Sequence, residues 1–166
     1  MSKYLAESDI ETAAIEWLLE DKRFQYQYGP NIQRNHKKAV LEHRFAAYLQ
    51  NRYRHVPAKI LAEVQQEFLY QSGTDLHHRN HSFQLKLSKG ISKNWKDEKG
   101  KECFEHFYAV DFDEPANNEY WAVNQFSIEG RNNRRSDLLI FINGLPVVLF
   151  EFKNWFDPEA TVDSAF

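Results

Sequence analysis

The chain has 166 residues, 42% of them hydrophobic, with 24 acidic and 21 basic side chains and a formal net charge of −3. This length suits one domain with a sizeable core. No apolar run approaches the roughly 18 residues of a membrane span, and the first residues carry no secretory signal. Cys103 is the only cysteine, which excludes an internal disulfide and a thiolate zinc site. We therefore expect a single cytoplasmic domain over residues 1–166.

Charge is unevenly spread along the chain. Residues 31–60 carry seven lysines and arginines against one acidic residue, Glu42, which gives this segment a charge of +6. Residues 1–30 carry −3. A local basic surface can bind phosphates even when the whole chain is acidic. A solvated helix face has the same composition, so both interpretations remain open here.

The first half of the chain has the apolar spacing of helices. Ser8 and Glu11 fit a capping box at the start of a helix over residues 8–21, and apolar side chains recur along one face behind them. The same spacing predicts three further helices, over residues 35–54, 57–71 and 75–87.

The second half has the pattern of strands, expected over residues 91–95, 102–110 and 120–128. Leu138–Ile142 and Val147–Phe152 are continuous apolar runs, typical of strands buried on both faces. Asn143 and Gly144 between them are a strong hairpin signal. Helices followed by strands predict an α/β fold whose sheet comes from the second half. Because residues 160–166 read as the start of another helix, we expect a domain truncated at its C-terminus.

Three charged residues lie within or directly beside these apolar runs. Asp137 precedes one strand, while Glu151 and Lys153 lie at the end of the next, two residues apart and so on one face. Charged groups rarely enter such a run without a function. Two carboxylates on neighbouring strands can hold Mg²⁺ or Mn²⁺, and an ammonium group beside them can orient an attacking water. The pattern suits phosphodiester hydrolysis, and a buried Glu–Lys salt bridge is the alternative.

Seven segments extend this pattern: residues 11–18, 28–30, 111–113, 123–126, 131–137, 141–148 and 151–154. Together they resemble the N-terminal nuclease domain of type I restriction enzyme R subunits, which belongs to the PD-(D/E)-x-K superfamily. The resemblance implies a restriction-endonuclease-like mixed central sheet flanked by helices, with an inserted helical segment. It also implies cleavage of double-stranded DNA with Mg²⁺ after an ATP-driven motor has translocated it. The implied partners are methyltransferase and specificity subunits.

The resemblance also assigns roles to residues. Asp137 and Glu151 match metal ligands, and Lys153 matches the residue that positions the nucleophilic water. Glu11 matches a metal-binding glutamate of the first helix, although capping that helix is an alternative role. Separately, three arginines stand just before Asp137 and are candidates to bind DNA phosphates, with turn solvation as the alternative. They are Arg131, Arg134 and Arg135.

The sequence departs from the family pattern in three ways. Ser136 stands where the superfamily name has proline. The chain ends before the glutamine–tyrosine motif that follows the E-x-K strand. It also has no G-x-x-x-x-G-K-[ST] loop, so we expect the motor downstream and no ATP binding by this chain alone. The runner-up function is a non-catalytic module that binds DNA or docks subunits.

The catalytic assignment carries a geometric condition. A two-residue Asn143-Gly144 turn in a regular hairpin would pair Asp137 with Phe150 and point Glu151 to the opposite face. Side chains share a face only at paired positions or an even number of residues away. We therefore predict either a three-residue loop or a bulge in one strand that restores the parity.

Overall fold

The computed structural model describes residues 6–71 and 73–153, which fall into two compact units. Unit 1 combines residues 1–41 and 119–166, and unit 2 is the segment 42–118 inserted between them. The inserted helical segment is thereby confirmed, whereas a single nuclease domain over residues 1–166 stays a prediction. None of the helices in the described part of the chain has the length and apolar character that crossing a membrane requires.

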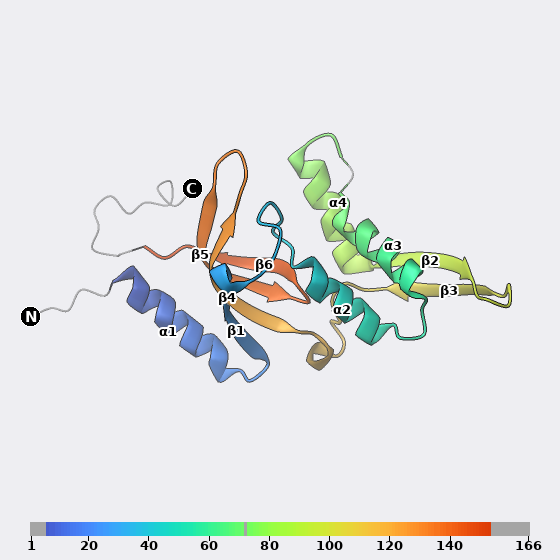
Figure 1. Ribbon diagram of the computed structural model, residues 1–166, viewed down its shortest axis with the longest axis horizontal. Helices are drawn as coiled ribbons and strands as arrows, with labels where there is room; N and C mark the ends of the chain where they lie inside the picture. Colours follow the sequence, from blue (N-terminus) through green and yellow to red (C-terminus); the bar gives the residue numbers. More distant parts are fainter. Residues whose placement is uncertain (1–5, 72, 154–166) are drawn as a thin grey trace, which may run out of the picture. The chain divides into compact units, whose positions relative to one another are not determined.

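Unit 1 is built on a four-stranded mixed sheet with the order β1-β4-β5-β6 (Figure 1). Strand β1 runs parallel to β4, and the other neighbours are antiparallel. The α/β class with a mixed sheet is therefore confirmed. The elements are α1 (Glu7–Glu20), β1 (Phe24–Tyr28), the 3-10 helix η1 (Gly29–Asn31), β4 (Tyr120–Ile128), β5 (Arg134–Ile142) and β6 (Leu145–Phe150).

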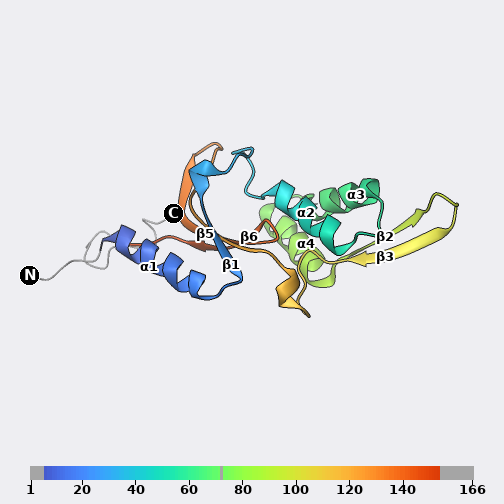
Figure 2. The ribbon, with the colours of Figure 1, turned by 60° about the horizontal axis from the view of Figure 1, so that its bottom comes forward.

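The two faces of this sheet bury separate apolar clusters, because successive strand residues point to opposite sides. On one face, Ala122, Leu138 and Ile140 pack against α1 through side chains such as Ile15 and Leu18. Figures 1 and 2 show α1 running along the sheet beside β1. The other face buries a second cluster: Ile32, Leu41, Val123, Phe126, Leu139 and Phe141.

Helix α1 begins one residue earlier than expected, and its cap differs. Ala6 is the N-cap, and its backbone N–H donates to Oδ2 of Asp9 at 3.0 Å. The predicted capping box of Ser8 and Glu11 is therefore wrong, because Asp9 already occupies the third position after the cap. Glu11 lies instead on the half-buried side of α1 together with Ala14, Ile15 and Leu18.

Strand β1 was not anticipated, so the sheet does not come from the second half of the chain alone. Its sequence Phe24-Gln25-Tyr26-Gln27-Tyr28 alternates aromatic rings with amides. This period of two is a strand signal, and the segment pairs with Tyr120–Asn124 of β4. Strand β5 also starts before the predicted Leu138, because Arg134 already pairs with Ile128.

The turn at Asn143 and Gly144 is hydrogen-bonded to Leu41 and Glu119, the residues at which the chain leaves unit 1 and returns to it. The Leu41 N–H donates to the Gly144 carbonyl at 2.9 Å. The Asn143 side chain accepts from the Glu119 N–H at 2.8 Å, and the Asn143 N–H returns a bond to the Glu119 carbonyl. Since Leu41 is buried in the sheet core, the predicted helix over 35–54 is shortened and begins only at Glu42.

Unit 2 contains three helices and a two-stranded antiparallel sheet, which extends past the helices in Figure 2. The predicted helices near 57–71 and 75–87 are confirmed, and Gly90, with a φ of 69°, ends the second of them. The elements are α2 (Glu42–Arg52), α3 (Ala58–Leu69), α4 (Leu76–Lys89), β2 (Ile91–Lys96), β3 (Glu102–Phe107) and the 3-10 helix η2 (Pro115–Asn117).

Strand β6 departs from the burial that its sequence predicts. It is an edge strand of the sheet. Val147, Val148 and Leu149 are 41%, 44% and 49% exposed, so the expectation that both faces are buried is wrong for the described residues. The further helix expected over residues 160–166 lies outside the described part of the chain.

Candidate active site

The β5–β6 hairpin turns through two residues. Asn143 and Gly144 have φ values of 52° and 81°, and Ile142 pairs with Leu145. Positive φ at both central positions fits a type I′ turn, whose twist matches that of the flanking strands. Asn-Gly is the favoured sequence for this turn, because both residues tolerate the left-handed region. The three-residue loop that we considered is therefore wrong.

A bulge at Val147 restores the parity that the catalytic assignment needs. Phe141 pairs with Pro146 but Ile140 pairs with Val148, so Val147 is an extra residue in β6. Beyond the bulge the register continues regularly as far as Leu138 and Phe150. One further step sets Asp137 opposite Glu151. The predicted bulge is confirmed. That the two carboxylates share one face stays a prediction.

Asp137 also fixes the short segment that carries Glu151 and Lys153. Its Oδ2 atom accepts a hydrogen bond from the backbone N–H of Phe152 at 2.7 Å. This bond ties residues 151–153, which follow the last residue of β6, to the neighbouring strand. One carboxylate of the pair therefore has a structural role as well as a negative charge.

The Glu151 carboxyl lies half-buried beside like charge. Burial raises its pKa first, the negative charge of Asp137 raises it further, and the positive charges of Lys153 and Arg134 oppose the shift. No described residue donates a hydrogen bond to this carboxylate, and Lys153 is exposed without an ion pair to it. The structure thus lacks the Glu–Lys salt bridge considered as the alternative.

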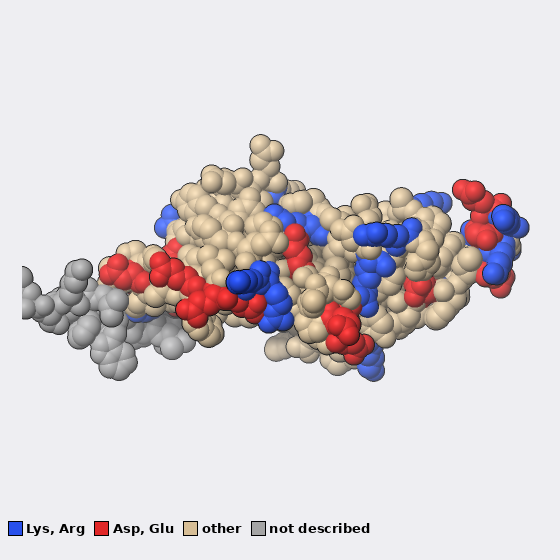
Figure 3. Space-filling view, turned by 90° about the horizontal axis from the view of Figure 1, so that it is seen from below, with Lys and Arg blue, Asp and Glu red and all other residues tan. Residues whose placement is uncertain are grey.

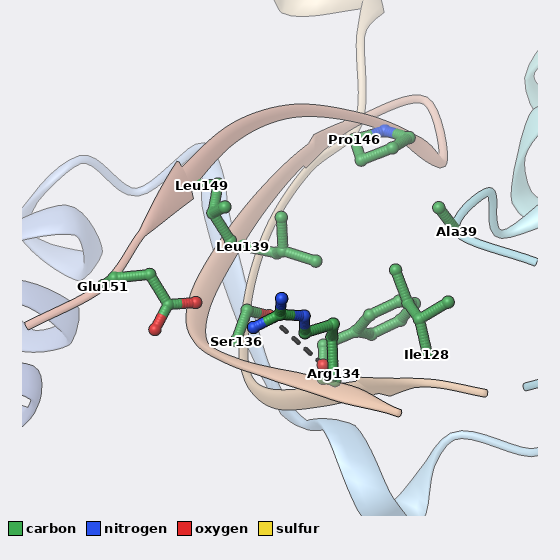
Figure 4. Close-up of a pocket in the computed structure, with 9 residues that line it drawn as sticks. Ala39, Ile128, Arg134, Ser136, Leu139, Pro146, Leu149 and Glu151 are labelled. Carbon is green, nitrogen blue, oxygen red and sulfur yellow. Dashed lines mark hydrogen bonds between the residues drawn. The ribbon is translucent and has the colours of Figure 1, made fainter. Parts of the chain in front are cut away.

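Glu151 and Arg134 both reach into a pocket of about 430 Å³ on the sheet face opposite α1 (Figure 4). Apart from these two groups the lining is mainly apolar. Ser136 also lines it, and its hydroxyl donates to the Phe126 carbonyl at 3.2 Å, the dashed line in Figure 4. Serine at the expected proline position therefore joins β5 to β4. The remaining lining residues are Ala39, Phe126, Ile128, Leu139, Pro146 and Leu149.

The three arginines that precede Asp137 do not form one cluster. All three are exposed. Arg134 lies in the pocket and lowers the pKa of Glu151. Arg135 is the next residue of β5 and is not among the residues that line the pocket. Arg131 lies in the turn between β4 and β5, at the end of a hairpin that extends beyond β6 in Figure 1.

Glu11 is held against β4 by two amide side chains. Nδ2 of Asn124 donates to its Oε1 at 2.6 Å, and Nε2 of Gln125 donates to its Oε2 at 2.9 Å. The sequence assigned no role to these two amides, although both lie in segment 123–126 of the resemblance. Two adjacent amide residues in a largely apolar strand were the sequence feature that could have indicated a role for them.

The donor chemistry of the site fits a hard divalent cation. The charge of Asp137 opposes ionisation of Glu151, and a cation between two carboxylates offsets such repulsion. Within residues 6–71 and 73–153, no three His, Cys, Asp or Glu side chains gather as a metal-binding group. Mg²⁺ nevertheless is usually bound through one or two carboxylates and keeps several waters. A direct metal contact by Glu11 stays a prediction.

Comparison with known proteins identifies the family. The family model of the type I restriction enzyme R protein N terminus matches residues 4–166. The chain belongs to this family. It is 29% identical over 156 residues to the type I restriction enzyme MjaIXP endonuclease subunit of Methanocaldococcus jannaschii, and 30% identical over 172 residues to the HindI endonuclease subunit of Haemophilus influenzae.

These alignments cover 87% and 98% of the chain but only 15% and 16% of the two relatives. This chain therefore corresponds to a small part of each of the two endonuclease subunits. The resemblance found in the sequence is confirmed at the level of the family.

Proposed function

We propose that this chain provides the DNA-cleaving site of a type I restriction endonuclease. The reaction is hydrolysis of phosphodiester bonds in double-stranded DNA, with Mg²⁺ or Mn²⁺ as cofactor. The observation that carries the proposal is the bulge at Val147, because without it Asp137 and Glu151 would face opposite sides of the hairpin. An extra residue with this consequence is what a catalytic pair on two antiparallel strands requires.

Each charged group has a role in this proposal. Asp137 and Glu151 hold the cation, which when bound supplies Lewis-acid stabilisation of charge on the phosphate. The Lys153 ammonium, close enough to lower the pKa of Glu151, positions the attacking water and stabilises the charge that develops in the transition state. The exposed Arg131, Arg134 and Arg135 contact DNA phosphates.

The remaining parts of the activity belong to the longer enzyme. We place the ATP-driven motor that translocates DNA downstream of this chain, and the methyltransferase and specificity subunits as its partners. The support is family membership, together with the small share of each relative that the chain covers.

Calorimetric titration of the full chain with Mn²⁺ tests the metal site. Asp137→Asn and Glu151→Gln keep the shape of each side chain but remove a charge, and both should abolish the binding that the wild type shows. Lys153→Ala should retain binding and abolish DNA cleavage in the full-length enzyme. Glu16→Gln removes an exposed charge on α1 and serves as the matched control. Unchanged binding in both site variants would remove the metal site and favour a non-catalytic DNA-binding or docking module.

A further inference from the structure

The two hydrogen bonds to Glu11 come from consecutive residues of one strand. Consecutive side chains of a regular strand point to opposite faces, so Asn124 and Gln125 should not reach the same group. They do so because Gln125 has a φ of 53°, in the left-handed region that residues with side chains rarely adopt. The ladder with β5 is interrupted at this residue, between the pairs Asn124–Leu138 and Phe126–Ser136.

The interruption lies opposite Asp137. Counting along the two strands from the flanking pairs puts Gln125 level with Asp137, and Asp137 is in turn level with Glu151. The strained residue of β4 therefore stands in the same row as the two proposed metal ligands. Strained backbone outside glycine persists where the surroundings enforce it, and it is often found at functional sites.

Two neighbours of this strand fix the arrangement. Gly29 packs against the distorted backbone, since a Cβ there would lie 2.6 Å from the Asn124 carbonyl oxygen and 2.8 Å from that of Gln125. The Tyr26 hydroxyl donates to Oδ1 of Asn124 at 2.9 Å, which leaves the Nδ2 donor of the amide directed to Glu11. Both oxygens of the Glu11 carboxylate are thereby held in place.

We propose that Asn124 and Gln125 are positioning residues, which act on the cation site by holding Glu11 level with Asp137. The inference rests on the proposed function. The left-handed backbone of Gln125 turns two neighbouring amide side chains toward one carboxylate. A carboxylate need not touch Mg²⁺ or Mn²⁺ to strengthen its binding, because these ions keep part of their water shell.

A double-mutant cycle on Mn²⁺ affinity tests the proposal in the full chain. Gln125→Gly removes the amide and accepts the left-handed backbone without strain. It should weaken Mn²⁺ binding about 10-fold, as substitutions behind metal ligands commonly do. The same substitution made in a Glu11→Ala background should have no further effect, because the amide acts only through Glu11. Gln33→Gly, at an exposed glutamine of the same unit, is the matched control and should leave affinity unchanged.

The outcomes separate this inference from the proposed function. Equal weakening by Gln125→Gly in both backgrounds, or no weakening in either, overturns the positioning role. Unchanged Mn²⁺ affinity in Glu11→Ala overturns it too, while loss of binding in Asp137→Asn and Glu151→Gln leaves the proposed function standing. A wild-type chain that binds no Mn²⁺ overturns both.

Discussion

Ionisation of Glu151 works against the stability of the folded chain. A half-buried carboxyl group beside Asp137 is harder to ionise than one in water, and this raises its pKa above the ordinary value. The unfolded chain therefore loses its proton at a lower pH than the folded chain. Stability that is present in acid is lost as the pH rises from the ordinary glutamate pKa through the raised one.

We expect Glu151→Gln to stabilise the metal-free protein at neutral pH. Glutamine cannot ionise, so the variant escapes the loss that the wild type suffers on alkalinisation. Thermal unfolding with a chelator present should show a higher Tm for the variant near pH 7, and a difference that shrinks toward about pH 4, where glutamate is protonated. A difference independent of pH would mean that ionisation of Glu151 is not its cause.

A second prediction at this scale concerns Gly29. The Cβ of Gly29→Ala would collide with two backbone carbonyls of β4, and backbone cannot swing aside as a flexible side chain can. We expect the free energy of unfolding to fall by about 1–3 kcal/mol, the usual cost of overpacking. Gly130→Ala is the matched control, because the nearest atom to its Cβ lies 3.8 Å away. Denaturant unfolding of both variants measures the difference, and equal losses would contradict it.

At the scale of elements, the deciding feature is the bulge in β6. Its importance lies in the number of residues between Asp137 and Glu151, since a one-residue slip turns every later side chain to the other face. We predict that deleting Val147 abolishes Mn²⁺ binding even though the turn and both strands remain. Val147→Ala keeps the count and should bind normally. Retained binding after the deletion would show that the bulge does not set the site.

Elements were predicted from the sequence with uneven success. Parity at Asp137 and Glu151 required either an odd loop or a bulge, and the choice depended on the φ of Asn143 and Gly144. The helix expected to begin near residue 35 was wrong because Leu41 packs into the sheet core. Apolar spacing identifies a buried side chain but does not say which element covers it. The two hydrogen bonds to Glu11 depend on the left-handed backbone of Gln125, which sequence periodicity does not show.

Charge is segregated on unit 1 as a whole. Figure 3 shows acidic side chains gathered along α1. The exposed acidic residues of α1 are Glu7, Asp9, Glu16 and Glu20. Phosphates are repelled from this surface, whereas the exposed arginines belong to β5 and to the turn before it. We therefore expect DNA to approach unit 1 from the β4–β5 hairpin rather than across the outer side of α1.

Salt dependence of DNA binding tests this orientation. Each arginine that contacts a phosphate should contribute about 0.9 to the slope of log affinity against log salt. Removing Arg131 and Arg135 should reduce the slope by about 2 in fluorescence anisotropy with a short duplex and no metal. Lys22→Ala, an exposed positive charge at the end of α1, should leave the slope unchanged. An unchanged slope in the arginine variant would place DNA elsewhere.

The turn at Asn143 and Gly144 also bears on how this architecture can vary. Leu41 and Glu119, where the chain leaves and re-enters unit 1, are both hydrogen-bonded to it. The two ends of the inserted segment are therefore fixed at the same turn of the sheet, and the sheet's own contacts do not depend on the length of chain between them. Insertions are tolerated best where their ends already lie close together. We therefore expect that a shorter, longer or unrelated segment can replace residues 42–118 while the β5–β6 hairpin keeps its register.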